Sequence, residues 1–194
     1  MRLALYRAIR IFGLATLCTL IVACSPQFDW RTIKNDAQGY SVMFPSKPQL
    51  IERSIIYQTT SLKQTLEFAK VDEDVFAVMT TQIPATIATQ VTLVEQMLKN
   101  TLLRQANTTQ FNPVKDVTSR IGPAGQAKQV TQDYYLGLPE SKKVMRVRWL
   151  IRPAANDSVN LYQISVIRTG QSSQLESLLN QENITIFFDE FRPN

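Results

Sequence analysis

The chain of 194 residues contains no histidine, and its only two cysteines are Cys18 and Cys24. Without histidine, the usual general base near neutral pH is missing, and a serine or cysteine nucleophile lacks its usual activating partner. The sequence also lacks the Gly-x-Ser-x-Gly and Ser-x-x-Lys motifs, a phosphate-binding glycine loop and a dinucleotide-binding fingerprint. We therefore expect no catalytic residue, no metal site and no cofactor. Only carboxylate, lysine or tyrosine chemistry remains for an enzyme.

Cys24 is the one residue whose surroundings indicate covalent chemistry. Residues 1–10 contain three arginines and no acidic residue, and residues 11–23 are uncharged. A basic segment followed by an uncharged one is the order found in a signal peptide. The alternative is a membrane-spanning helix, but the uncharged segment is shorter than the roughly 20 residues that such a helix needs. Ile21-Val22-Ala23-Cys24 resembles the lipobox of bacterial lipoproteins, although leucine is commoner where Ile21 stands.

This resemblance implies cleavage between Ala23 and Cys24, followed by attachment of diacylglycerol to the Cys24 thiol and of a fatty acid, such as palmitate, to its new amino group. Several acyl chains give effectively permanent membrane attachment. Ser25 resembles the residue found in lipoproteins sorted to the outer membrane, if the host is Gram-negative. The expected location is the periplasmic face of the outer membrane.

Net charge argues against a nucleic-acid partner. The full chain has a net charge of +5, but Arg2, Arg7 and Arg10 lie in the leader. Removing them leaves 18 basic and 16 acidic side chains, a net charge of +2. That excess is too small for an electrostatic nucleic-acid surface.

A basic ladder is the most distinctive candidate surface of the mature chain. Its residues share one parity of a predicted strand, whose other parity is apolar. The ladder consists of Lys142, Arg146, Arg148 and Arg152. Anionic lipid or an acidic envelope protein would suit such a surface. The other interpretation, which is favoured, is a solvated outer face with cross-strand pairs to residues such as Asp133.

Two further groups have a structural and a functional interpretation. Residues 72–74 (Asp-Glu-Asp) form either a solvated hairpin turn or a cation site, and the absence of a calcium-loop glycine favours the turn. The large aromatic residues between 134 and 162 form either a core or a ligand pocket, and the core is favoured. They are Tyr134, Tyr135, Trp149 and Tyr162.

The chain divides into a signal peptide (1–23), a lipidated tether (24–38) and a single domain (39–194). Alternating apolar residues predict strands, at 40–44, 51–57, 62–71, 75–82, 116–121, 126–136, 143–151 and 159–168. Within the tether, Phe28, Trp30 and Ile33 are candidates for packing against the domain.

Apolar residues at helical spacing predict one helix between the two groups of strands and helical segments after them. The first begins near Thr92, the second opens near Ser173, and the last contains Ile184, Phe187, Phe188 and Phe191. The order predicts an α+β fold: a mainly antiparallel sheet of about seven or eight strands with two or three packed helices.

The two ends of this domain resemble those of PsbP-like domains. Residues 39–45 (Gly-Tyr-Ser-Val-Met-Phe-Pro) match their opening strand, and residues 187–192 are similar to their closing segment, although many have serine where Glu190 stands. The resemblance implies a PsbP-like sandwich and a binding or assembly role rather than catalysis. We therefore expect a lipid-anchored, non-enzymatic binding or assembly module of the cell envelope. The alternatives are a carrier that holds a small hydrophobic or anionic ligand between sheet and helix and, more remotely, a carboxylate-dependent hydrolase.

Overall fold

All eight strands predicted between residues 40 and 169 are present in the computed structural model, which describes residues 28–121 and 129–194. Their observed bounds are β2 (Tyr40–Phe44), β3 (Gln49–Tyr57), β4 (Thr60–Val71), β5 (Asp74–Ile83), β6 (Asn112–Ile121), β7 (Gln129–Leu138), β8 (Lys143–Pro153) and β9 (Val159–Thr169). The leader, the lipobox residues Ile21–Cys24 and the Gly122–Gly125 turn lie outside the described residues.

Seven of these strands form one antiparallel sheet in the order β3-β4-β5-β9-β8-β7-β6. The β3–β4 and β4–β5 hairpins close with two-residue turns, whose first residues, Gln58 and Asp72, have a positive φ. Such turns match the twist of antiparallel strands. Asp72 and Glu73 are exposed in the second turn, as the turn interpretation predicts.

A second, small sheet was not predicted. It has the order β1-β2-β10, with β1 at Arg31–Asn35 and β10 at Arg192–Pro193. Part of the expected tether is therefore folded, and the domain begins before Gly39. Phe28, Trp30 and Ile33 pack against the core, as expected.

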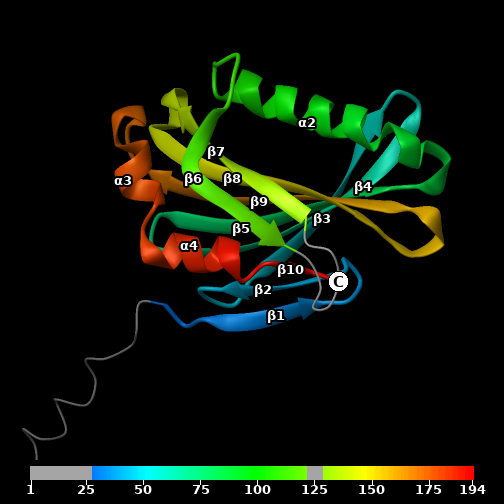
Figure 1. Ribbon diagram of the computed structural model, residues 1–194, viewed down its shortest axis with the longest axis horizontal. Coiled ribbons are helices and arrows are strands. Elements are labelled where there is room, and N and C mark those ends of the chain that lie inside the picture. Colours follow the sequence, from blue (N-terminus) through cyan, green and yellow to red (C-terminus); the bar gives the residue numbers. More distant parts are fainter. Residues whose placement is uncertain (1–27, 122–128) are drawn as a thin grey trace, which may run out of the picture.

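Helix α2 (Val91–Gln105), preceded by the 3-10 turn η2 (Ala85–Gln90), lies over one face of the large sheet (Figure 1). It begins beside the β3–β4 hairpin, where Tyr57 donates a hydrogen bond to Gln90 at 3.1 Å. Its buried residues Val94 and Leu102 join a cluster that includes Trp149 and reaches Leu136 on β7. The helix therefore crosses the sheet diagonally.

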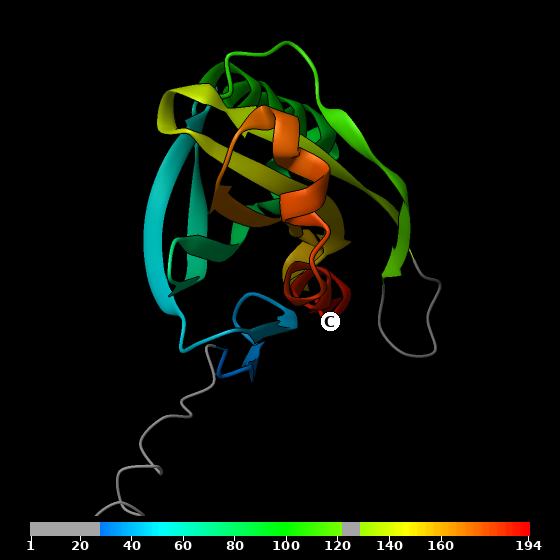
Figure 2. The same cartoon turned by 90° about the vertical axis from the view of Figure 1, so that its left-hand side faces the viewer.

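The opposite face is covered by α3 (Leu175–Leu179), α4 (Glu182–Asp189) and the small sheet (Figure 2). Phe187 on α4 lies between Phe44 of the small sheet and Phe76 of the large one, with both ring centroids 5.4 Å away. The predicted final helical segment is present but ends at Asp189, and Phe191 is buried beyond it. Short 3-10 turns occur at η3 (Pro139–Ser141), η4 (Ala155–Asp157) and η5 (Ser172–Gln174).

The α+β assignment is confirmed, with two sheets instead of one. Within residues 28–121 and 129–194, no helix is both long enough and apolar enough to cross a bilayer.

Candidate functional site

The basic ladder is not an exposed surface, and that expectation is wrong for its two central residues. Arg146 and Arg148 are only 1% and 0% exposed. Strand β8 does place its arginines on the face opposite Met145, Val147 and Trp149, as alternation predicts. The arginine face, however, is the one that α3 and α4 cover.

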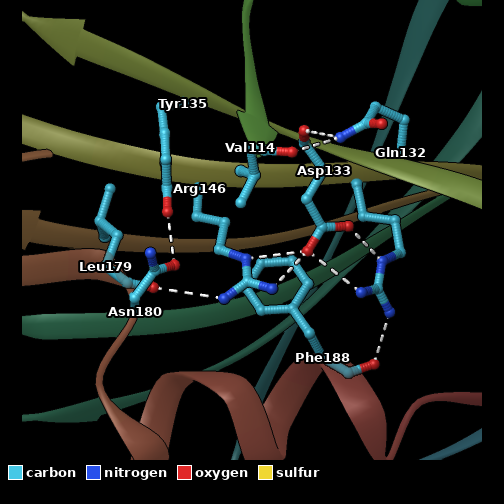
Figure 3. Close-up of polar contacts among 9 residues, drawn as sticks. Val114, Gln132, Asp133, Tyr135, Arg146, Leu179, Asn180 and Phe188 are labelled. Atoms are coloured by element: carbon cyan, nitrogen blue, oxygen red, sulfur yellow. Dashed lines mark hydrogen bonds and ion pairs between the residues drawn. The ribbon is translucent and has the colours of Figure 1, made fainter. Parts of the chain in front are cut away.

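Asp133 on the neighbouring strand β7 binds both arginines and explains their burial (Figure 3). Its Oδ2 accepts from Arg146 Nε at 2.8 Å, and its Oδ1 accepts from Arg148 Nε at 2.5 Å. This is the cross-strand pairing to Asp133 that the alternative interpretation named. It lies inside the molecule because all three side chains are covered.

The cluster of Asp133, Arg146 and Arg148 has two positive charges and one negative charge. Backbone carbonyls near the ends of α3 and α4 stabilise the positive charge that Asp133 leaves in excess. The Leu179 carbonyl, at the last residue of α3, accepts from Arg146 Nη1 at 3.3 Å, and the Phe188 carbonyl of α4 accepts from Arg148 Nη1 at 2.7 Å. The Phe188 ring centroid lies 4.5 Å from the Arg146 guanidinium carbon. Helix C-termini and aromatic faces both attract cations. The cluster therefore fixes two helices to the sheet.

Arg168 on β9 makes a third contact of this kind. It donates to Asp74 Oδ1 at 2.7 Å and to the Leu178 carbonyl of α3 at 3.0 Å. Asp74, from the acidic run, is 8% exposed and forms this ion pair from β5, whereas Asp72 and Glu73 lie exposed in the turn.

The outer members of the ladder are more accessible. Lys142 is exposed directly after η3 with a φ of 50°, and Arg152 is partly exposed where β8 pairs with Asn160. Because the two residues between them are buried, the four do not form one cationic surface.

The α2 side of the sheet instead carries an apolar groove of about 650 Å³. Its floor consists of same-face residues that are in register across neighbouring strands. They are Ile51, Leu66, Met79 and Gln163 in one row, Phe68, Ala77 and Ser165 in the next, and Val75, Ile167 and Met145 in the third. Along β5 the rows span about 13 Å, at roughly 3.3 Å per residue.

The diagonal course of α2 leaves this floor open. The helix forms one wall, through Leu98, Thr101, Leu102 and Gln105. It passes over the centre of the sheet toward β7. It therefore leaves uncovered one corner of the sheet, which is formed by the start of β3, the end of β4 and the start of β5. Leu66, Phe68 and Val75 consequently stay partly exposed.

The polar groups of the groove suit binding more than catalysis. Arg53 and Glu140 are its charged residues, and its other polar groups are hydroxyls and amides. Neither a nucleophile with a base partner nor a pair of carboxylates lines it, among the residues that the structure describes.

The aromatic residues singled out in the sequence do not form a common pocket. Trp149 is 7% exposed under α2, whereas Tyr135 and Tyr162 are buried on the other face. Tyr134 is partly exposed, with Lys99 6.0 Å from its ring centroid. The core interpretation is confirmed for the three buried residues.

Buried tyrosines join the small sheet to the large one. Tyr40 donates to the Glu67 carboxylate, and Tyr162 donates to the Gln38 carbonyl at 2.7 Å. Burial raises the pKa of both tyrosines, and for Tyr40 the hydrogen bond to Glu67 raises the pKa further. Both therefore remain neutral structural groups well into the alkaline range.

No three Cys, His, Asp or Glu side chains come together as metal ligands within residues 28–121 and 129–194. The chain matches no protein-family model, and no curated protein is detectably similar to it in sequence. The case for a function therefore depends on the groove.

Arg53 and the groove were missed at the sequence level. One signal in the sequence could have indicated the groove. Leu66 and Phe68 share one apolar face of a predicted strand, and only one long helix is predicted to cover that face of the sheet. A single helix covers a strip narrower than seven strands, since strands lie about 4.8 Å apart and a helix is about 10 Å wide.

Proposed function

We propose that this protein is a non-enzymatic binding module, anchored by lipid at Cys24, which holds an elongated apolar molecule in the groove between α2 and the sheet. The observation that carries the proposal is the row of partly exposed apolar side chains on the groove floor. Contiguous exposed apolar surface on a globular protein typically marks an interaction site. Of the functions considered, this is the carrier that holds its ligand between sheet and helix.

The groove also has the dimensions of a small-molecule site. Ligand sites typically enclose about 300–1,000 Å³ and combine apolar walls with a few polar groups. The depression at the other end of the sheet is similar in volume, about 570 Å³, but polar groups form about half of its lining, a larger share than in the groove. A carboxylate-dependent hydrolase finds less support, because Glu140 is the only carboxylate among the groove residues.

An assembly role is the second candidate, favoured by the edge strand β3. Leu50 and Ile56 are 53% and 65% exposed on the side of this strand that faces away from the groove. An exposed strand edge is a ready template for pairing with another chain. Chemical crosslinking in intact envelopes would distinguish this role, because it predicts protein adducts at β3.

The anchor and the domain family are further parts of the proposal. The lipobox-like residues Ile21–Cys24 support lipidation and an outer-membrane location at the periplasmic face. Strand β2 before Pro45 and the α+β architecture, with helices packed on an antiparallel sheet, support a PsbP-like domain. Replacing Cys24 with alanine is expected to abolish labelling by a fatty-acid probe in cells. Unchanged labelling of that variant would refute the lipoprotein assignment.

Ligand binding can be tested on the mature chain from Ser25 onward with the neutral fluorophore phenylnaphthylamine. We expect saturable fluorescence enhancement that hexadecanol reverses. Replacing Ala77 on the floor with phenylalanine is expected to weaken binding at least tenfold, because the larger ring occupies the groove. The matched control is Ala85→Phe in η2, which is exposed and outside the groove. Equal binding by both variants, or no binding by the parent, would refute the proposal.

A further inference from the structure

The groove contains one cation, Arg53, among the described residues that line it. The side chain projects from β3, in register with Gln64 on β4 and Thr81 on β5. The three residues share the face of the sheet on which the groove lies.

Arg53 is held over the floor by a short polar chain. Its Nε donates to Gln64 Oε1 at 2.9 Å, and Gln64 Nε2 in turn donates to Thr81 Oγ1 at 2.8 Å. Gln64 and Thr81 are each only 1% exposed, so this support is rigid. Arg53 Nη2 lies 3.7 Å from Met79 Sδ, which places the guanidinium above the first row of the floor.

Arg53 also differs in its electrostatic partners from the three arginines that contact α3 and α4. Arg146, Arg148 and Arg168 each form an ion pair with an aspartate. No carboxylate lies within ion-pair distance of Arg53 in the part of the chain that the structure describes. Its neighbour Glu52 pairs with Lys63 at 2.8 Å instead. The positive charge at the groove is therefore positioned without being neutralised.

We infer that the ligand of the groove is a single-chain amphiphile with an anionic head, bound with its head on Arg53 and its alkyl chain along the floor. This inference rests on the proposed function and names its ligand class. A guanidinium presents planar, fork-like donors that match carboxylate and phosphate oxygens. With Nε engaged by Gln64, the Nη groups face the ligand, and the apolar rows from Met79 to Val75 accept the chain.

The test uses the mature lipidated protein in phosphatidylcholine nanodiscs and two photoactivatable probes. The probes are palmitate and hexadecanol, each with a diazirine at the same carbon, so that only the charge of the head differs. The fraction of crosslinked protein is measured against probe concentration, and the adduct is mapped by mass spectrometry. We expect adducts on groove residues and an affinity about tenfold higher for palmitate, as suits a charge-assisted hydrogen bond at an exposed arginine.

Three variants separate recognition of the anionic head from general electrostatic attraction. Arg53→Gln is expected to abolish the preference for palmitate and to leave hexadecanol binding unchanged. Lys70→Gln also removes one positive charge from this face of the sheet, but at an exposed position on β4 outside the groove. This control is expected to retain the preference for palmitate. Arg53→Lys is expected to give an intermediate preference, because it keeps the charge but loses the fork.

Each outcome has a distinct meaning. Equal affinity of the parent protein for both probes would overturn the inference and leave the proposed function standing. Equal losses in Arg53→Gln and Lys70→Gln would also overturn it, since the effect would then be long-range attraction. Absence of groove adducts with either probe would refute the proposed function itself. Competition by hexadecyl phosphate as well as by palmitate would extend the class to phosphate heads, whereas competition by palmitate alone would restrict it to carboxylates.

Discussion

The two faces of the seven-stranded sheet differ in what covers them. The face under α3 and α4 carries arginines and is closed, with core residues such as Val144, Ile164 and Phe188 at 0% exposure. The face under α2 is apolar, and yet part of it is open. Charge along a strand therefore does not identify the outer face, because aspartates and helix C-termini can neutralise it. The elements packed on each face decide which one meets solvent.

Loss of Asp133 is expected to have the largest effect, because it would leave two buried guanidinium groups without their carboxylate. Asp133→Asn should lower the free energy of unfolding by about 3–5 kcal/mol, measured by urea denaturation. The control Glu140→Gln removes an exposed carboxylate at the groove and should change stability by less than about 0.5 kcal/mol. Similar losses in the two variants would contradict the account of the closed face.

The same substitution on each face gives a direct comparison. Phe188→Ala should cost about 3–5 kcal/mol, because the ring is fully buried. Phe68→Ala should cost less than about 2 kcal/mol, since its ring is already partly exposed in the groove. Thermal unfolding measures both values, and phenylnaphthylamine binding should fall only in the Phe68 variant. Equal stability costs would show that the groove is closed in solution.

Alkaline pH should destabilise the closed face through Tyr40 and Tyr162, whose pKa values burial raises. In the unfolded chain tyrosine ionises near pH 10, whereas the buried tyrosines stay protonated to higher pH. Their contribution is fully present below about pH 10 and is lost as the pH rises toward the folded-state pKa, by about 1.4 kcal/mol per pH unit for each tyrosine. Urea denaturation between about pH 9 and about pH 11.5 measures this slope. Tyr40→Phe should reduce it, and an unchanged slope would contradict the assignment.

The smallest expected effect is at Gln64, which positions Arg53 without carrying charge. Gln64→Leu should reduce the preference for palmitate over hexadecanol about threefold, and it should cost roughly 1 kcal/mol of stability through the lost hydrogen bonds. The two-probe crosslinking assay measures the preference. A preference as strong as that of the parent would mean that Arg53 acts without this support.

The strands and α2 were predictable from the sequence because their patterns are local. Tyr40, Val42 and Phe44 alternate with more polar or exposed neighbours, and the β2 bounds match the prediction. Strand β1 was not predictable in this way. Its sequence, Arg-Thr-Ile-Lys-Asn, has a single apolar residue, and it is a strand because it pairs with β2.

The candidate site was less predictable, since it depends on long-range packing. Alternation placed Arg146 and Arg148 on one face of β8 correctly but gave no information about what covers that face. The covering groups, the carbonyls of Leu179 and Phe188, lie 33 and 40 residues away along the chain. The groove depends likewise on the angle at which α2 crosses the sheet, and no single strand pattern encodes that angle.

The packing of Phe28 against Trp30, with ring centroids 5.8 Å apart, would limit how far the domain could move from a lipid anchor at Cys24. Only residues 25–27 separate Phe28 from Cys24, so a lipid on Cys24 would hold the domain on a leash of about 14 Å, even when that leash is fully extended. The described chain begins at Phe28, which packs against the core on the face of the large sheet opposite α2, where the small sheet lies (Figure 2). With Cys24 lipidated, the α2 face, which carries the groove, would lie on the side of the sheet opposite the attachment point. A ligand or partner of that face would then approach the domain from the side opposite the attachment point.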